Sequence, residues 1–360
     1  MDVISVRMKE SVERGEAVGY VTLVQRRGEV VHLSAVGMQD REKGVAMKTD
    51  TIFQVMSMTK PVTSVGIMML AEDGLLALTD TVEKHLPEFR GQMVRVGDVL
   101  RKPARAITIR DLLTHTSGLQ EMPPEGMGGT NFYFDMKHTL AEAVTFYSQL
   151  PLLFEPGTKW QYSNTGMATL GRIIEVVSGK PYETFLQERV FGPLGMKDSF
   201  FFPKPEHYAR IAMAYDAGPD GKPRSMGEVI YRKQRKYSMP EGGLFATAAD
   251  MAAFYQMMLN GGVYKGKRLL SKAAVEVMTA WHTEDTRRNW GLGWSLMRTP
   301  GAGLTLSSPK AYGHAGALGT FGWVDPARQL VGVFLVQAFG LQTDGARDIF
   351  VEVANASVVE

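Results

Sequence analysis

The sequence predicts an α+β fold in which an antiparallel sheet is built from N- and C-terminal segments and flanked by helices, with a mainly helical region inserted between them. Near the N-terminus, the β-branched runs 20–25 and 30–35 flank a turn that contains glycine. Near the C-terminus, the apolar runs 320–324 and 330–337 flank a turn at Asp325. Helical periodicity dominates the residues between these two hairpins.

The chain has 360 residues, which is long enough for two subdomains around a shared cleft. We expect residues 1–360 to form a single unit. Its mainly sheet-containing part is expected to comprise residues 1–75 and 285–360, and its mainly helical part residues 76–284. No internal repeat, low-complexity tract or change in composition marks a flexible linker.

The first predicted helix begins near Ser57 and ends at Gly74, and apolar residues surround nearly its whole axis, which is typical of a helix buried on most sides. Cap and stop signals predict four more helices, which begin near Thr108, Asn164, Thr247 and Asp344. His115 follows the second predicted helix, so we expect it to serve in capping or turn packing. The Pro- and Gly-rich residues 122–129 are expected to form a loop.

Charge and composition exclude several classes of function. Lys and Arg (40) nearly balance Asp and Glu (38), and the formal net charge is +2 without long runs of one sign. Neither nucleic acid nor a membrane surface is therefore implied as a partner. The absence of cysteine excludes disulfides, thiolate metal sites and a cysteine nucleophile. No metal-ligand cluster or cofactor motif occurs, so we expect no metal and no cofactor.

The N-terminal residues 1–10 contain no apolar core of the signal-peptide type. The longest apolar stretch, from Val65 to Ala71, is too short to span a bilayer. We therefore expect a cytoplasmic protein without membrane insertion. A signal peptide removed before residue 1 would instead place the protein in the periplasm or outside the cell. The sequence leaves the oligomeric state open.

The first candidate motif is Ser-Met-Thr-Lys, from Ser57 to Lys60. Residues three apart share a helix face, so the Ser57 hydroxyl and the Lys60 ammonium are expected to lie side by side. An amine surrounded by an apolar helix loses solvation, which lowers its pKa and lets it accept the serine proton. The same spacing recurs at residues 307–310, in a Gly/Ser/Pro-rich stretch that we interpret as a loop. The spacing alone is therefore ambiguous.

The second candidate motif is Tyr-Ser-Asn, from Tyr162 to Asn164, immediately before a predicted helix. A phenol and a carboxamide can project from such a turn into a cleft. A nearby ammonium favours the phenolate over the neutral phenol, whose pKa is ordinarily about 10. Tyr162 would then relay a proton to a leaving group, while Asn164 bonds the serine–lysine pair or the substrate. A buried tyrosine followed by Asn164 as the cap of the helix is the structural alternative.

The third candidate motif is Gly-His-Ala-Gly-Ala, at the start of a predicted strand. The small residues Ala315 and Gly316 let a substrate approach the strand edge. The amide of Ala317 can complete an oxyanion hole with the amide of Ser57. His314 would line the far wall of the site as a donor or partial charge. A histidine beside a strand also has a purely structural interpretation.

Taken in order, the three motifs resemble the signature motifs of the serine β-lactamase and penicillin-binding protein family. Residues 113–119, 241–250 and 291–294 resemble connecting segments of its class C-like branch, so the resemblance covers nearly the whole chain. That branch also contains family VIII carboxylesterases, D-amino-acid-specific peptidases and acyltransferases. The resemblance implies a β-lactamase/transpeptidase-like fold and a small-molecule ester or amide as substrate.

The resemblance also implies roles for individual residues. Ser57 would form an acyl-enzyme, Lys60 and Tyr162 would share the roles of general base and general acid, and the backbone amides of Ser57 and Ala317 would form the oxyanion hole. The sequence does not divide the base and acid roles between the lysine and the tyrosine. The residues that would contact the substrate are Asn164, His314, Ala315 and Gly316.

The third motif departs from the family pattern. β-Lactamases usually present Lys-Thr-Gly there, which offers the substrate carboxylate a fixed cation and a hydroxyl. His314 is mostly neutral at pH 7, and Ala315 has no hydroxyl. We therefore expect a carboxylesterase for short or medium acyl esters, with weak or no β-lactamase activity. The alternatives are a β-lactamase or D-alanyl-D-alanine-type peptidase, an acyltransferase, or a catalytically silent ligand-binding or sensor protein.

Overall fold

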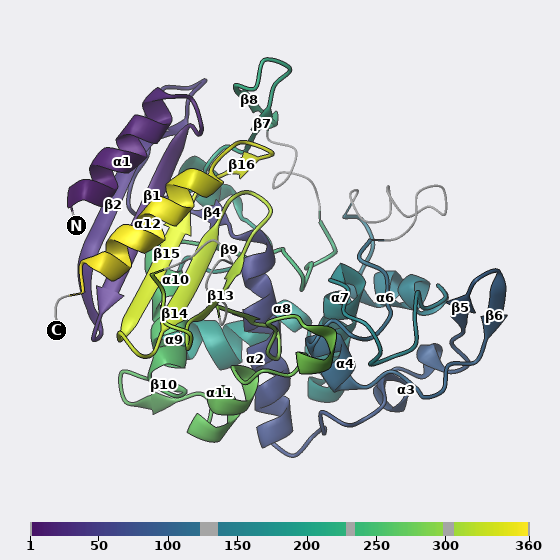
Figure 1. Cartoon of the computed structure of the whole chain (residues 1–360). Helices are drawn as coiled ribbons and strands as arrows, with labels where there is room; N and C mark the ends of the chain where they lie inside the picture. The colour runs from purple at the N-terminus through teal and green to yellow at the C-terminus, as the bar shows by residue number, and fades with distance from the viewer. Residues whose placement is uncertain (1, 123–135, 228–234, 298–305, 359–360) are drawn as a thin grey trace.

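The computed structural model describes residues 2–122, 136–227, 235–297 and 306–358. Within them, the largest sheet has seven antiparallel strands in the order β12-β13-β14-β15-β1-β2-β3 (Figure 1). Its strands are β1 Gly19–Arg26, β2 Glu29–Asp40, β3 Val45–Ala46, β12 Ser295–Leu296, β13 Tyr312–Ala315, β14 Phe321–Asp325 and β15 Leu330–Leu335. Because β1 pairs with β15, the prediction that both ends of the chain build one sheet is confirmed.

Helices cover both faces of this sheet. α1 Asp2–Glu13 and α12 Asp344–Ala356 lie together on one face (Figure 1), and α10 Ala248–Leu259 packs against β14 and β15 from the other. The helix predicted from Asp344 is confirmed, whereas α1 was not predicted. Its inward residues Ile4 and Met8 have the helical spacing of four, but Val3 and Val6 are exposed, so the apolar residues of the segment do not mark one face.

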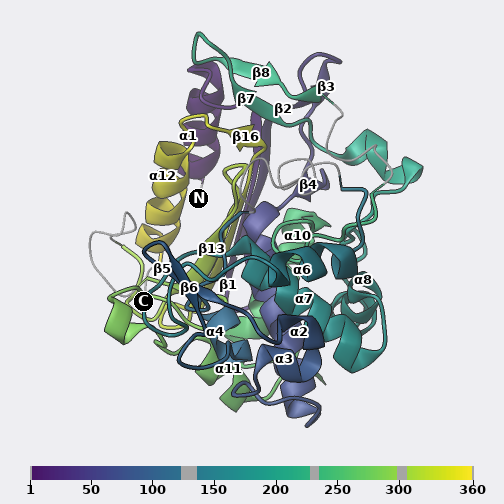
Figure 2. The same cartoon turned by 90° about the vertical axis from the view of Figure 1, so that its right-hand side faces the viewer.

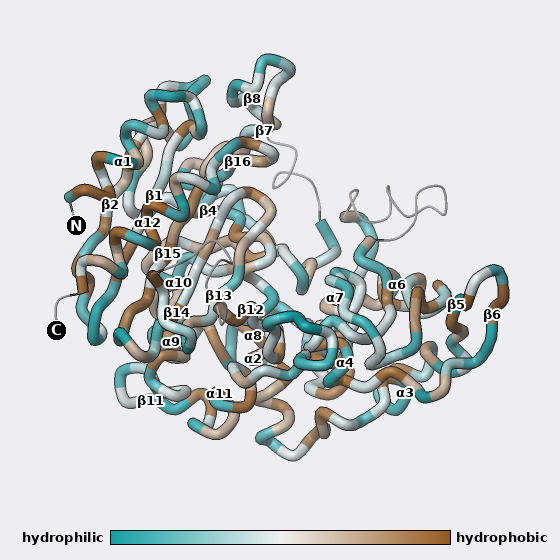
Figure 3. The backbone as a smooth tube through the Cα atoms, viewed as in Figure 1, coloured by the Kyte–Doolittle hydropathy of each residue, from teal (hydrophilic) through white to brown (hydrophobic). Residues whose placement is uncertain are grey.

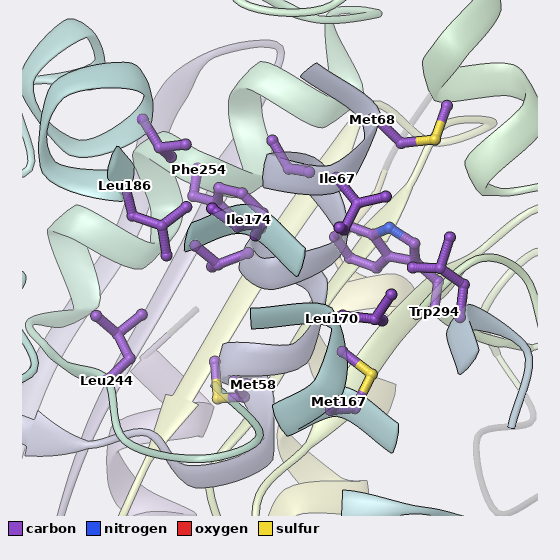
Figure 4. Packing of buried hydrophobic residues seen from close by; sticks show 14 of the residues in the cluster. Met58, Ile67, Met68, Met167, Leu170, Ile174, Leu186, Leu244, Phe254 and Trp294 are labelled. Carbon is purple, nitrogen blue, oxygen red and sulfur yellow. The ribbon is translucent and has the colours of Figure 1, made fainter. Parts of the chain in front are cut away.

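α2 Thr59–Glu72 is the central helix of the molecule, and every residue from Thr59 to Leu70 is buried. It packs against α7 Asn164–Ser178, whose apolar residues share one cluster with those of α2 (Figure 4). The two helices approach closely because Gly66 has no side chain: a Cβ there would lie 2.9 Å from Cδ1 of Ile174. The predicted burial of this helix on most sides is therefore confirmed.

The predicted helix boundaries agree with the structure to within a few residues. Thr108 caps α4 Ile109–Leu113, and Thr247 caps α10. Ser163, and not Asn164 as the structural alternative had it, caps α7, because its Oγ accepts a hydrogen bond from the backbone N–H of Gly166 at 2.9 Å. Gly179 ends α7 in a left-handed conformation with a φ of 68°. The ends of these helices are therefore set by capping residues that lie next to them in the sequence.

The remaining elements are short. The helices among them are α3 Val82–His85, α6 Leu140–Ser148, α8 Tyr182–Leu186, α9 Gly192–Leu194 and α11 Lys272–Met278. The strand groups are β4 Phe53–Gln54 with β9 Phe245–Ala246, β5 Val94–Val96 with β6 Val99–Arg101, β10 Val263–Tyr264 with β11 Lys267–Arg268, and β7 Tyr215–Ala217 with β8 Pro223–Ser225 and β16 Ala338–Phe339. Figure 2 shows α2, α3, α6, α7 and α8 grouped away from α1 and α12.

Hydropathy follows this arrangement. In Figure 3 the projecting β7–β8 hairpin is mostly hydrophilic, whereas hydrophobic segments recur along the strands and helices of the interior. Among the described residues, no helix is both long and apolar enough to cross a membrane. The division of the chain into a sheet-containing part and a helical part at residues 75 and 285 stays a prediction.

Two predicted loops have different outcomes. The second Ser-x-x-Lys segment, at residues 307–310, forms a turn, and Ser308 Oγ donates to a carboxylate oxygen of Asp325 at 2.6 Å. The serine of this motif, Ser307, accepts a hydrogen bond from Asn355 Nδ2 at 3.3 Å, and the segment is a turn and not a buried helix, in agreement with the loop interpretation. The loop predicted at residues 122–129 lies outside the described residues beyond Met122.

Candidate active site

Ser57 lies in a short 3-10 turn that leads directly into α2. The preceding residue, Met56, has a φ of 51°, a left-handed conformation that is uncommon for a residue other than glycine and that clusters at functional sites. The turn is held on both sides. Val55 N–H donates to the carbonyl of Leu244 at 2.9 Å, and Thr59 Oγ1 donates to the carbonyl of Met56 at 2.6 Å. A partly exposed Ser57 is thereby fixed above a buried helix.

Lys60 lies one helical turn below Ser57 and is completely buried. Its Nζ donates to Ser57 Oγ at 2.8 Å and to the carbonyl oxygen of Glu241 at 2.7 Å. Burial lowers the pKa of Lys60 to about 7, and the carboxylates of Glu241 and Glu121 oppose that shift by smaller amounts. About half of the Lys60 side chains are therefore neutral amines at pH 7, able to accept the Ser57 proton. The predicted pairing of serine and lysine is present.

Tyr162 completes a group of three with Ser57 and Lys60. The Lys60 Nζ lies 4.6 Å from the centre of the Tyr162 ring, and the phenol forms a hydrogen bond with Ser57. Burial raises the pKa of Tyr162 above its usual value, and the bond with Ser57 offsets only part of this effect. The phenol is therefore protonated at pH 7. The expectation that a nearby ammonium would favour the phenolate does not hold, because burial outweighs it.

His314 lies on β13 and is buried beside the Tyr162 ring, with the two ring centres 6.2 Å apart. Its Nδ1 is 2.6 Å from the carbonyl oxygen of Ala315. A carbonyl oxygen only accepts hydrogen bonds, so Nδ1 carries the proton and Nε2 carries the lone pair. Burial, and to a smaller extent the charge of Lys60, lower the pKa of His314 to about 3. The third motif therefore contains a neutral imidazole and not a cation, and its buried Nε2 has no hydrogen-bond partner among the described residues.

The end of β13 packs directly on the segment that precedes Ser57. A Cβ at Gly316 would lie 2.2 Å from Thr320 Oγ1 and 2.5 Å from the Val55 carbonyl oxygen, so only glycine fits there. Thr320 Oγ1 also donates to that carbonyl at 2.8 Å. Ala315 and Ala317, on either side of Gly316, are exposed. The predicted strand edge and the Ser57 turn are therefore adjacent.

Asn164 departs from the expectation for the second motif. It begins α7 two residues after Tyr162, but its Nδ2 donates to Met122 Sδ at 3.5 Å and not to the serine–lysine pair. A thioether sulfur is a weak acceptor. A stronger acceptor on a bound molecule can therefore replace it.

An aromatic wall that the sequence analysis did not predict stands behind Tyr162. We use the term aromatic wall for Trp160, Trp290 and His115, whose rings contact one another and Tyr162. His115 was expected to serve only in capping or turn packing. It does follow α4, but it is completely buried against this group. Its segment, residues 113–119, was interpreted only as a connecting piece, and neither Trp160 nor Trp290 was singled out, because residues so far apart in sequence give no local signal of contact.

Comparisons with known proteins agree with this geometry. The sequence model of the Beta-lactamase family, described as Beta-lactamase, matches residues 5–356. The chain belongs to the Beta-lactamase family. It is 32% identical to Protein Rv1367c of Mycobacterium tuberculosis, covering 94% of this chain and 90% of that one. It is 30% identical to Esterase EstB of Burkholderia gladioli, covering 87% and 82%.

Solved structures confirm the fold of this Beta-lactamase family member. A structure titled "EstCE1, a hydrolase with promiscuous acyltransferase activity" superposes with a TM-score of 0.81 and 23% identity, over 97% of each chain. The β-lactamase/transpeptidase-like fold implied by the three motifs is therefore confirmed. The family membership supports the serine hydrolase class, and it does not identify the substrate.

The low pKa of Lys60 predicts how the reactivity of Ser57 depends on pH. Only the neutral amine accepts a proton, and its fraction rises from about a tenth at pH 6 to about nine tenths at pH 8 for a pKa near 7. The rate constant for labelling of Ser57 by a fluorophosphonate is expected to rise about tenfold across this range and then level off. Lys60→Met should slow labelling and flatten the profile. A flat profile in the wild-type protein would contradict the assignment of Lys60 as base.

Proposed function

We propose that this protein is a carboxylesterase that cleaves short or medium acyl esters through an acyl-enzyme on Ser57. The observation that carries the proposal is the combination of the Ser57, Lys60 and Tyr162 group with a third motif that is electrically neutral. The first feature supports acyl transfer to serine. The second disfavours the carboxylate-bearing substrates of β-lactamases and peptidases.

In the proposed first half-reaction, the neutral Lys60 amine takes the Ser57 proton while Oγ attacks the ester carbonyl carbon. The amides of Ser57 and Ala317 stabilise the oxyanion. When the bond to the alcohol breaks, Tyr162 gives its phenol proton to the leaving oxygen and receives the proton that Lys60 holds. The products of this step are a free alcohol, an acyl-enzyme and a neutral lysine.

In the second half-reaction, water takes the place of the alcohol and the same groups act in reverse. Tyr162 takes a proton from water and passes one to Lys60, while the water oxygen attacks the acyl carbon. Collapse of the intermediate releases the acid, and Lys60 returns the proton to Ser57 Oγ. Because both proton carriers are neutral at rest, each half-reaction moves one proton and leaves no net charge behind.

The third motif supports the preference for uncharged esters. A substrate carboxylate at this strand edge would find no cation in His314, which is buried and neutral, and no hydroxyl in Ala315. We propose that Asn164 Nδ2 and the backbone of Gly316 complete the substrate contacts, with Asn164 exchanging the Met122 sulfur for a substrate oxygen.

Turnover of p-nitrophenyl butyrate and nitrocefin, measured side by side, tests the proposed activity. The wild-type protein is expected to hydrolyse the ester rapidly and nitrocefin weakly. Ser57→Ala should lower ester turnover at least about 1,000-fold, because the nucleophile is lost. A Ser57→Ala protein with wild-type ester turnover would contradict the proposal. Dominant cleavage of nitrocefin, or of D-alanyl-D-alanine peptides, would favour the β-lactamase or peptidase alternative.

Acyl transfer is a second candidate, favoured by the similarity of the fold to that of EstCE1, which is described as a hydrolase with promiscuous acyltransferase activity. It is distinguished by product analysis in the same assay. An added alcohol would then be acylated faster than water and would raise the rate of nitrophenol release. A stable acyl adduct without turnover would instead indicate a catalytically silent sensor.

The neutral third motif generates a prediction about specificity. The double substitution His314→Lys with Ala315→Thr supplies a cation and a hydroxyl for a carboxylate. It is expected to raise nitrocefin turnover relative to butyrate ester turnover about tenfold, since hydrogen bonds to charged groups contribute about 1.5–3 kcal/mol. The matched control, His314→Gln with Ala315→Thr, keeps the motif neutral and should leave the ratio within about threefold. An equal change in both variants would contradict the charge argument.

A further inference from the structure

His115 brackets Tyr162 from both sides along the chain. The backbone N–H of Gln161, just before the tyrosine, donates to the His115 carbonyl oxygen at 2.9 Å. The backbone N–H of Ser163, just after it, donates to the His115 Nδ1 at 3.2 Å. The two rings lie with their centres 4.6 Å apart. One histidine therefore fixes both flanks and one ring face of the proposed proton relay.

The protonation state of His115 follows from these contacts. Because Nδ1 accepts from an amide, the proton of the neutral ring must be on Nε2. Complete burial holds the pKa of His115 well below its usual value, and the nearby Lys60 acts in the same direction. His115 therefore stays a neutral acceptor toward Ser163 throughout the range in which Lys60 titrates.

Simple packing does not account for a histidine at this place. Within the described chain, the buried Nε2 has no hydrogen-bond partner, and the backbone φ of His115 is 56°, in the left-handed region. An apolar side chain would fill the same space without burying a donor. Glycine would adopt this backbone more readily, and asparagine would adopt it about as readily as histidine does. The imidazole of His115 combines a flat ring against Tyr162 with a hydrogen-bond acceptor for the amide of Ser163. None of these other side chains supplies both.

We propose that His115 is a positioning residue whose carbonyl, Nδ1 and ring together hold the Tyr162 phenol against Ser57 and Lys60. This proposal rests on the proposed function, because Tyr162 must carry a proton for its position to affect the rate of ester hydrolysis. His115 itself touches neither the substrate nor the reacting atoms. Its effect must therefore pass through the Tyr162 hydroxyl, and it must disappear when that hydroxyl is absent.

A double-mutant cycle tests this dependence. His115→Phe keeps a ring and removes the acceptor, and His115→Asn keeps an acceptor near the position of Nδ1 and tolerates the left-handed backbone. Each is made in the wild-type protein and in Tyr162→Phe, which keeps the ring and lacks the hydroxyl. The values of kcat and KM for p-nitrophenyl butyrate are measured per active site, as counted by fluorophosphonate labelling.

His115→Phe is expected to lower kcat about 10- to 100-fold with KM within about threefold, since a small misplacement of a reacting group costs rate and not binding. His115→Asn should lose less than about tenfold. In the Tyr162→Phe background, both changes should alter kcat less than about twofold. Equal factors in the two backgrounds, or a loss explained by fewer active sites, would overturn the proposal.

His32 provides a matched control. It is also a buried histidine, bonded to Thr22 Oγ1 at 2.8 Å, but it lies on β2, with β1, β15 and β14 between it and β13. His32→Phe should leave kcat per active site unchanged, and its effect should be the same in both Tyr162 backgrounds. A coupling to Tyr162 as large as that of His115 would mean that the cycle reports general disturbance, and the proposal would fail.

A second readout separates this proposal from the proposed function. Fluorotyrosine incorporated at position 162 reports the environment of that ring by ¹⁹F NMR, whether or not the protein turns over an ester. The signal is expected to shift or broaden in His115→Phe and to stay unchanged in His32→Phe. An unchanged signal in His115→Phe would overturn the positioning role. Failure of ester turnover with a shifted signal would overturn only the proposed function.

Discussion

The desolvation of Lys60 is the constraint on which the rest of the site depends. Its amine lies at the head of a helix whose residues are buried from Thr59 to Leu70, and the nearby carboxylates only partly offset the loss of water. Removing a cation from water costs several kcal/mol, so the proton is released near pH 7. The packing of α2 therefore sets the basicity of its lysine. The close contact of α2 with α7 at Gly66 therefore contributes to the chemistry of the site as well as to the packing of the core.

The three rings near this amine, those of His314, His115 and Tyr162, carry no charge near pH 7. Burial keeps His314 and His115 neutral, and it keeps the Tyr162 phenol protonated. A second cation would repel the Lys60 proton further and would bind anionic substrates. A phenolate at Tyr162 would instead stabilise the protonated form of Lys60. Neutral neighbours thus support both parts of the proposed function: the lysine as base and the ester as an uncharged substrate.

Local features of the sequence predicted the parts of this arrangement that depend on nearby residues. The Ser57–Lys60 spacing and the apolar pattern after it define a buried helix with both groups on one face, and caps such as Thr108 mark the other helices. The contacts across the fold carry no such signal. The Glu241 carbonyl oxygen, which accepts a hydrogen bond from Lys60 Nζ, comes from a segment distant in sequence. The His115 ring that packs against Tyr162 also comes from a distant segment. The direction of the Asn164 amide toward Met122 depends on a rotamer that spacing does not set.

The titration of Lys60 itself is the most direct test of the central claim. The protein is labelled with ¹³C at the lysine Cε positions, and the chemical shifts are followed from pH 5 to pH 11, with Lys60→Met supplying the assignment. One resonance is expected to titrate near pH 7 and to be missing from Lys60→Met. If no resonance that depends on Lys60 titrates near pH 7, burial does not activate this amine, and the account of Ser57 is wrong.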